Sequence, residues 1–272
     1  MLKIRLIPVV LLRNGAVVQS KGFQRYQKLG DPTTIVRRLS GWAADELIYL
    51  DISRDAVYDI GRDDLNTPNR NNILEILRDV SRECFMPLTF GGRVRTLEDA
   101  RERVRSGADK VAINTQALAD RKFIRLLSRE LGSQCVVVCI DVRRDENGKA
   151  LVFADGGRTP TGRDAIEWAR DAEAQGAGEI LLQSIDRDGR GSGYDIDLIR
   201  AVTEAVGIPV IALGGAGDYD DFKAVAAQTG CSAVAAANIF HYRENSVYLA
   251  KKCMYEAKLE VRHPMIYKER DL

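Results

Sequence analysis

The sequence predicts an α/β protein of the (β/α)8, or TIM-barrel, class, folded as a single domain from two half-barrel repeats. Eight short β-branched runs alternate with helix-like segments, and the length of 272 residues slightly exceeds the ~250 typical of such barrels. No linker divides the chain, because its one Gly/Pro-rich stretch, Gly156–Gly162, leads directly into another helix-like segment. A doubly wound open sheet normally carries a GxGxxG turn after its first strand, and none follows Leu12.

The predicted strands are short apolar runs, and the segments between them carry apolar residues at helical spacing. The strands are Ile4–Leu12, Glu46–Ile52, Met86–Phe90, Lys110–Asn114, Cys135–Val142, Glu179–Ser184, Pro209–Leu213 and Ala233–Ala237. Helical spacing is found in Thr33–Trp42, Leu97–Val104, Ala165–Ala174 and Leu198–Val206. Thr96 with Asp99, and Asp120 with Phe123, stand where helix N-caps and first turns belong.

An internal repeat supports a barrel made of two halves. ADELIYLD at 44–51 resembles AGEILLQS at 177–184, and MPLTFGG at 86–92 resembles IPVIALGG at 208–215. Each half then holds four βα units, as a closed barrel built from half-barrels requires. We expect the barrel to span residues 1–258. The charged tail 259–272 is expected to lie over the outside or to fray.

Composition and charge exclude several classes of function. The net charge of +1 leaves no basic field for nucleic acid, and the arginine-rich run 93–105 alternates with acidic residues, as a solvated helix face does. No apolar run approaches the ~20 residues that span a bilayer, and the N-terminus has no signal-peptide layout. The five cysteines contain no CxxC pair, which favours reduced thiols in the cytoplasm. His241 and His263 belong to no cluster with metal-ligand spacing, so neither a metal nor another cofactor is expected.

Glycine and small polar residues follow several predicted strands, at the barrel end where active-site loops lie. These segments are GG at 91–92, NT at 114–115, DRDG at 186–189 and LGGAG at 213–217, and Asn238 follows the last strand. Glycine lets backbone N–H groups approach an anion, and a following helix N-terminus adds partial positive charge. Each pair taken alone could equally be a tight βα turn. Two such cradles in symmetric positions favour a doubly phosphorylated ligand.

The ordered motifs along the chain resemble one family. LIPVVLL, ADELIYLDI, GADKVAINT, GSQCVVVCID, DRDG and IPVIALGGAG follow one another as in HisF, the cyclase subunit of imidazole glycerol phosphate synthase, over residues 1–258. The resemblance implies a barrel that binds a substrate with a phosphate at each end and takes ammonia from a glutaminase subunit docked at the barrel bottom. It places one phosphate at Gly92, Asn114 and Thr115. It places the other at Gly189, Gly214, Gly215, Ala237 and Asn238.

Four charged residues stand at the starts of predicted strands one, two, four and six: Arg5, Glu46, Lys110 and Glu179. Their charges sum to zero, so on their own they predict a salt-bridge layer that closes the barrel end opposite the active site. The resemblance adds a function to this layer, because all four match the gate through which the family admits ammonia. It therefore implies a heterodimer with a HisH-like glutaminase.

The sequence departs from the family at residues that carry out the reaction or bind the substrate. The family's cyclase relies on two aspartates as general acid and base; Asp141 matches the strand-five residue, whereas Leu11 stands at the strand-one position. Gln19 replaces the lysine of the family's first loop, with Lys21 two residues further on, and Arg93 replaces the third glycine of GGG. Asp51 and Asp188 are candidate site residues as well, with loop capping as their alternative role.

These departures point to the glycosyl-amidation paralogues of HisF, which are WbuZ-like. In that interpretation a HisH-like glutaminase makes ammonia, this barrel conveys it, and a separate amidotransferase uses it on a nucleotide-linked sugar for surface polysaccharide. The alternative is a genuine cyclase of histidine biosynthesis that uses another acid. A single-chain isomerase like the related HisA barrel fits less well, because that chemistry also needs the strand-one acid and has no use for the gate.

Overall fold

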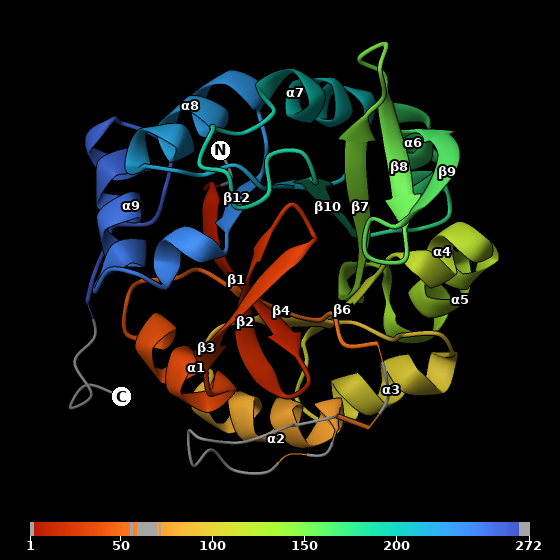
Figure 1. Ribbon diagram of the computed structural model, residues 1–272, viewed down its shortest axis with the longest axis horizontal. Coiled ribbons are helices and arrows are strands. Elements are labelled where there is room, and N and C mark those ends of the chain that lie inside the picture. The colour runs from red at the N-terminus through yellow and green to blue at the C-terminus, as the bar shows by residue number, and fades with distance from the viewer. Residues whose placement is uncertain (1–2, 55–56, 59–69, 71, 267–272) are drawn as a thin grey trace.

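The computed structural model describes residues 3–54, 57–58, 70 and 72–266. Within them, eight parallel strands form a closed barrel surrounded by helices (Figure 1). The barrel strands are β1 (Arg5–Arg13), β4 (Leu47–Asp51), β5 (Leu88–Gly91), β6 (Lys110–Ile113), β7 (Val136–Arg144), β10 (Glu179–Ser184), β11 (Val210–Leu213) and β12 (Ala233–Ala236). Pairing of β7 with β10 and of β12 with β1 closes the ring. The predicted fold class is confirmed.

The helices follow the barrel strands, as the alternating pattern predicts. They are α1 (Pro32–Ser40), α2 (Ile73–Glu83), α3 (Leu97–Arg105), α4 (Thr115–Ala119), α5 (Lys122–Leu131), α6 (Ala165–Ala174), α7 (Ile196–Ala205), α8 (Tyr219–Thr229) and α9 (Ser246–Glu256), with short 3-10 turns at Ser133–Cys135 and Asn238–Phe240. Thr96 caps α3 in a reciprocal capping box with Asp99, as its spacing predicts. Asp120 accepts a hydrogen bond from the Lys122 backbone at the start of α5.

Two β-hairpins extend the barrel strands, and the sequence interpretation missed both. β2 (Ala16–Lys21) and β3 (Arg25–Gly30) follow the first barrel strand, whereas β8 (Ala150–Ala154) and β9 (Thr159–Asp164) follow the fifth. β3 and β9 are largely exposed and polar, so they lack the apolar signal that marks the barrel strands. The hairpins lie four barrel strands apart, at corresponding positions of the two half-barrels.

Two apolar layers hold the barrel together. Residues that point outward from the strands pack under the helices in the larger layer, which includes Trp168, Tyr49 and Phe90. Residues that point into the barrel form a smaller layer, to which Val18 of β2 adds from the hairpin. The inward residues are Ile7, Val9, Leu11, Ile48, Ala112, Val137, Cys139, Leu181, Ile211, Leu213, Ala233 and Ala235. This alternation is the period of two expected for β-strands between a filled interior and a helical coat.

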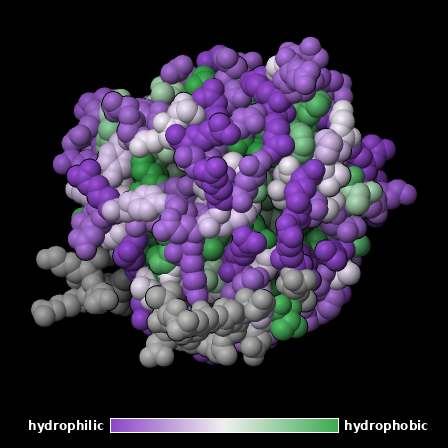
Figure 2. Space-filling model, viewed as in Figure 1, coloured by the Kyte–Doolittle hydropathy of each residue, from purple (hydrophilic) through white to green (hydrophobic). Residues whose placement is uncertain are grey.

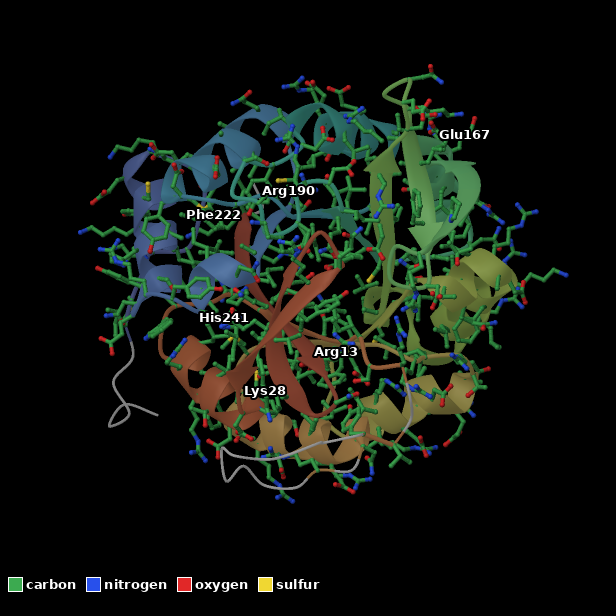
Figure 3. All side chains as sticks on the ribbon, in the orientation of Figure 1. Arg13, Lys28, Glu167, Arg190, Phe222 and His241 are labelled. Atoms are coloured by element: carbon green, nitrogen blue, oxygen red, sulfur yellow. The ribbon has the colours of Figure 1, made fainter. Side chains whose placement is uncertain are left out.

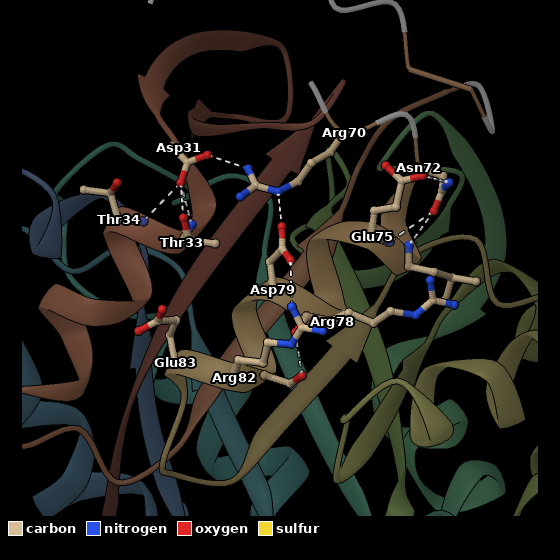
Figure 4. Close-up of polar contacts among 12 residues, drawn as sticks. Asp31, Thr33, Thr34, Arg70, Asn72, Glu75, Arg78, Asp79, Arg82 and Glu83 are labelled. Carbon is tan, nitrogen blue, oxygen red and sulfur yellow. Dashed lines mark hydrogen bonds and ion pairs between the residues drawn. The ribbon is translucent and has the colours of Figure 1, made fainter. Parts of the chain in front are cut away.

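A buried ion-pair cluster joins the first two helices of the barrel (Figure 4). Arg70 donates to Asp31, the N-cap of α1, over 2.5 Å and to Asp79 of α2 over 2.7 Å. Its side chain is only 8% exposed, so the two carboxylates compensate a charge that would otherwise be buried alone. The cluster fixes the start of α1 against α2.

The C-terminal segment returns to the N-terminal end of the barrel. Val261 is buried and forms a parallel bridge with Ile4, whose backbone N–H donates to the Glu260 carbonyl. Lys251 of α9 forms a buried ion pair with Asp45 over 2.8 Å, and Asp45 also accepts from the Leu6 backbone. Residues 259–262 of the predicted tail thus adjoin the barrel bottom, and 267–272 lie outside the described residues. None of the described helices is both long and apolar enough to cross a membrane.

Candidate functional site

A cavity of about 900 Å³ occupies the mouth of the barrel. Side chains from the carboxyl ends of β1, β4, β6, β7 and β10 line it, and residues of the loops after β4, β5 and β8 form its rim. The β2–β3 hairpin crosses in front of the barrel strands and adds Phe23, Gln24 and Tyr26 to the wall (Figure 1). This face of the molecule is mainly hydrophilic, with separate hydrophobic patches (Figure 2). The mouth is therefore a concave, polar-rimmed pocket at the end of the barrel where sites of this fold form.

Asp141 lies in the wall of this cavity, near the end of β7. Its side chain is buried, and its Oδ2 accepts a hydrogen bond of 2.8 Å from the Asn114 amide. Burial raises the pKa of Asp141 to about 7, and the neighbouring Asp188 carboxylate acts in the same direction. A carboxyl group with this pKa exchanges its proton near neutral pH, as a general acid or base must.

Leu11 lines the same cavity from β1 and is 5% exposed. Its register partners are Leu50 of β4 and Val18 of the hairpin, so its surroundings are mainly apolar. The fold thus brings the strand-one position and Asp141 into one cavity, with a proton-transferring group at only one of them.

The first predicted phosphate cradle lies in the cavity wall, with Gly92, Asn114 and Thr115 all among the lining residues. Gly92 has a φ of +105°, and a Cβ added there would lie 2.3 Å from the Asp51 carbonyl oxygen. Only glycine fits this close approach. Asn114 Oδ1 is buried and has no hydrogen-bond partner within the described structure, which leaves an acceptor available beside the cavity.

Asp51 also lies in the cavity wall, at the end of β4, and is held by local hydrogen bonds. Its Oδ1 accepts from the Ser53 backbone over 2.9 Å, and its Oδ2 accepts from the Tyr58 hydroxyl over 3.2 Å. Burial raises the pKa of Asp51, although these hydrogen bonds oppose the shift. The carboxylate therefore orders the loop after β4. This is the loop-capping role, one of the two roles that the sequence allowed for Asp51.

The second predicted cradle does not share this cavity, whose lining includes none of Gly189, Gly214, Gly215, Ala237 and Asn238. The β2–β3 hairpin occupies part of its space. Asn238 donates to the Ser20 carbonyl over 2.7 Å, and a Cβ on Gly189 would lie 2.2 Å from that same oxygen. Gly215 accepts from the Gly193 backbone N–H over 2.9 Å, which joins the loops after β10 and β11.

Asp188 holds the β2–β3 hairpin beside the second cradle through hydrogen bonds. It accepts 2.7 Å from the Ser20 hydroxyl and 3.3 Å from the Phe23 backbone, and its carbonyl accepts from Gly22. Burial raises its pKa. The β2 residues that replace the family's loop lysine contribute little to the mouth: Gln19 donates to Gln27 across the hairpin, and Lys21 is exposed and outside the cavity lining.

The four charged residues at the opposite end form a closed ring, as predicted. Arg5 donates to Glu46 over 2.6 Å and to Glu179 over 3.0 Å, and Lys110 contacts the same two carboxylates at 3.0 Å each. Burial of Arg5 opposes its charge, but Glu179 and Glu46 outweigh that effect and raise its pKa. The apolar inner layer of the barrel lies between this ring and the mouth.

Sequence reasoning placed Arg93 beside a phosphate cradle, at the third glycine position of GGG, but missed the other arginines of the mouth. Five arginines line the cavity: Arg13, Arg54, Arg93, Arg95 and Arg158. Arg13 stacks on the Tyr26 ring at 4.8 Å and lies beside the hairpin near the barrel centre (Figure 3). The signal was present in the arginine-rich run after β5, which was interpreted as a solvated helix face. That interpretation holds for Arg101 and Arg105 on α3. It fails for Arg103, which is 3% exposed and donates to the Gly92 carbonyl, and for the two loop residues before the helix, which line the cavity.

Metal and thiol chemistry have little support at this site. Among the described residues, no group of three or more His, Cys, Asp and Glu side chains is arranged to hold a metal ion. Cys139 lies in the cavity wall, and burial raises the pKa of its thiol, which disfavours the nucleophilic thiolate.

The fold and this site define a (β/α)8 barrel with a polar mouth at one end and a charged ring at the other. A family model described as "Histidine biosynthesis protein" matches residues 5–246. The chain is 41% identical over 263 residues to the imidazole glycerol phosphate synthase subunit HisF of Gluconacetobacter diazotrophicus, which covers 97% of each chain. It is 40% identical over 258 residues to the HisF subunit of Alkaliphilus metalliredigens, covering 95% of this chain and 98% of the relative. The chain belongs to this HisF-like histidine biosynthesis family.

These comparisons confirm the resemblance to HisF but give no support to the WbuZ-like subgroup. Both relatives carry the name that the sequence offered as the alternative to sugar amidation. The comparisons therefore favour histidine biosynthesis over sugar amidation. Leu11, at the position of the family's strand-one aspartate, remains the departure from that function.

Proposed function

We propose that this chain is the barrel subunit of a glutamine-dependent synthase of the imidazole glycerol phosphate synthase type. Ammonia enters through the charged ring and reacts with a doubly phosphorylated ligand in the mouth. The observation that carries the proposal is the placement of Asp141, whose pKa is about 7, beside the Asn114 amide in a cavity that also contains the Gly92 cradle. The two HisF subunits that the chain matches over nearly its whole length point to the same reaction.

The path between the two ends suits neutral ammonia. The inner layer consists of aliphatic side chains and one thiol, with alanine at three positions on β6 and β12. An apolar interior disfavours an ammonium ion far more than an uncharged ammonia molecule. The ring of two cations and two carboxylates lies where a glutaminase would deliver its product, so we assign it as the ammonia gate and the docking end for a HisH-like partner.

Asp141 would carry out proton transfer in the mouth, because Leu11 at the strand-one position cannot. With a pKa near 7 it holds or releases a proton at neutral pH, and Asn114 keeps its carboxyl group oriented through a hydrogen bond to Oδ2. Asp51 would hold the loop after β4, and the close backbone contact at Gly92 would bring N–H groups toward a phosphate.

A second candidate is the supply of ammonia for amidation of a nucleotide-linked sugar by a separate amidotransferase. One specific observation favours it: Leu11 places an aliphatic side chain in the cavity where the family's cyclase has its second carboxyl group. In that case the barrel would pass ammonia onward and the mouth would perform no cyclase reaction.

Ammonia-dependent turnover of the doubly phosphorylated HisF substrate tests both candidates in the wild type and in Leu11→Asp. We expect measurable turnover by the wild type and a rise of about 10²-fold or more in Leu11→Asp, because a second positioned carboxyl group typically contributes that much. Leu50→Asp is the matched control, since Leu50 is the register partner of Leu11 and lines the same cavity. A silent wild type with an active Leu11→Asp variant would favour the amidation candidate. Silence of both proteins would reject cyclase chemistry in this mouth.

A further inference from the structure

A buried arginine lies beneath the first phosphate cradle, outside the cavity lining. Arg103, in the last turn of α3, is only 3% exposed. Its Nη2 donates 2.7 Å to the Gly92 carbonyl oxygen, and its Nη1 donates 2.7 Å to the Asp99 carbonyl oxygen of its own helix. Gly92 belongs to the lining of the mouth, whereas Arg103 does not. The guanidinium group therefore contacts the cradle from the side that faces away from the cavity.

The charge of Arg103 is not matched by an ion pair among the described residues. Both of its hydrogen-bond acceptors are neutral carbonyl groups, and its Nε is buried without a described partner. Burial lowers the pKa of this guanidinium group, and the nearby carboxylates of Asp99 and Asp51 only partly oppose that shift. A buried cation is normally paired with a carboxylate, because an unpaired charge is costly to desolvate. Arg103 thus leaves positive charge beside the cradle, and a bound anion would neutralise it.

The contact with Gly92 also fixes the direction of a backbone donor. A trans peptide is planar, with its C=O and N–H groups pointing in opposite directions, and the described chain has no cis peptide. Because the Gly92 carbonyl points at Arg103, the N–H of the same peptide unit points away from Arg103, on the side of the cavity. This N–H belongs to Arg93 and donates to no acceptor among the described residues. It is therefore available to a ligand at the cradle.

The backbone conformation around this peptide requires support. Gly92 has a φ of +105° and Arg93 a φ of +56°, both in the region that residues with a side chain rarely adopt. An arginine in this region carries a conformational cost that a glycine would not. The hydrogen bond from Arg103 offsets part of that cost. Loss of the guanidinium group would therefore let the Gly92–Arg93 peptide turn, and its N–H would no longer face the cavity.

We propose that Arg103 is a positioning residue for the phosphate at the Gly92 cradle. It holds the N–H of the Gly92–Arg93 peptide toward the ligand, and the bound phosphate neutralises its buried charge. A hydrogen bond from a cation also polarises the peptide, which makes this N–H a stronger donor. The inference deepens the proposed function and rests on it, because it concerns one of the two phosphates at opposite ends of the ligand in the mouth.

Titration of the full chain with inorganic phosphate tests this role in the wild type, Arg103→Met and Arg103→Lys. Methionine carries neither a charge nor a donor, whereas lysine keeps the charge and can still donate to the Gly92 carbonyl. We expect Arg103→Met to weaken phosphate binding by about ten- to a hundredfold, the scale of a hydrogen bond to a charged group. Arg103→Lys should remain within about fivefold of the wild type, because it keeps the charge in place.

The backbone amide signal of Arg93 in the NMR spectrum reports whether this donor meets the anion. Phosphate should shift the signal in the wild type and in Arg103→Lys, and much less in Arg103→Met at the same concentration. Arg101→Met is the matched control, because it makes the same substitution on the same helix at an exposed arginine that pairs with Glu130. Its phosphate affinity should lie within about twofold of the wild type, since exposed charges are screened by salt.

In the turnover assay, Arg103→Met should raise KM for the doubly phosphorylated substrate more than it lowers kcat, because the phosphate is bound in both the ground state and the transition state. Wild-type phosphate affinity in Arg103→Met, or equal losses in Arg103→Met and Arg103→Lys, would overturn the inference. So would the absence of a phosphate shift at the Arg93 amide of the wild type, a measurement that needs no variant. Failure of the proposed function is distinct: wild-type turnover is then silent, although phosphate still shifts the Arg93 amide signal.

Discussion

Replacement of Asp141 by asparagine is expected to lower ammonia-dependent turnover by about 10²–10⁴-fold, the usual contribution of one positioned acid or base. Asparagine keeps the shape of the side chain and can keep the contact with Asn114 but cannot exchange a proton. The wild-type rate should depend on pH with a transition near 7, the pKa to which burial and Asp188 raise this carboxyl group. The transition should be absent from the residual rate of the variant. A variant with wild-type turnover would show that Asp141 carries no proton in the reaction.

The same variant should be more stable than the wild type at alkaline pH. The pKa of Asp141 is higher in the folded chain than in the unfolded chain, so the folded state loses stability as pH rises from about 4 through about 7. Above that range the wild type holds a buried carboxylate that the asparagine variant lacks. We expect Asp141→Asn to gain about 1–3 kcal/mol in free energy of unfolding at pH 8 and less at pH 5.

Urea unfolding of both proteins at the two pH values measures this difference. Asp155→Asn is a useful control, because Asp155 lines the same cavity but is exposed and paired with Arg158, which lowers its pKa. Its replacement should give no gain at pH 8. Equal stability of Asp141→Asn and the wild type at pH 8 would contradict the desolvation of this carboxylate.

The barrel was predictable because its strands carry strong local signals. β10 and α6 coincide with the predicted Glu179–Ser184 and Ala165–Ala174, and the other barrel strands differ from their predicted limits by at most two residues at either end. The fully buried barrel strands read as continuous apolar runs, and helix caps such as Thr96 with Asp99 mark where the coat begins. Apolar runs and helix caps are set by residues close together in the sequence, so they can be recognised without the fold.

The composition of the mouth was harder to predict, because it depends on contacts between distant segments. The β2–β3 hairpin has weak apolar alternation, yet its Ser20 carbonyl meets Asn238, 218 residues away, and covers the second cradle. Arg93 has the local sequence of a solvated loop, and only the fold brings it against the Arg54 carbonyl in the cavity wall. The charged ring was predictable in turn because its members occupy the same strand-start position in four strands.

That ring also predicts a large effect on stability. Arg5→Met removes one of the two cations that contact both carboxylates, and Lys110 must then compensate Glu46 and Glu179 alone. The two carboxylate side chains are only 9% and 12% exposed, so an uncompensated charge remains poorly hydrated. We expect the free energy of unfolding to fall by about 3 kcal/mol, the scale found when one member of a buried pair is removed. Denaturant unfolding at neutral pH measures this loss.

Two further variants separate charge balance from a general loss of packing. Adding Glu179→Gln to Arg5→Met restores a neutral ring and should recover part of the lost stability, because Lys110 and Glu46 still pair at 3.0 Å. Arg101→Met removes one partner of the exposed Arg101–Glu130 pair, whose side chains are each 39% exposed, and should cost at most about 1 kcal/mol. If Arg5→Met is as mild as Arg101→Met, the ring is well hydrated. It would then act as an open charged entrance to the barrel, and its four members would matter for ammonia entry without closing the fold.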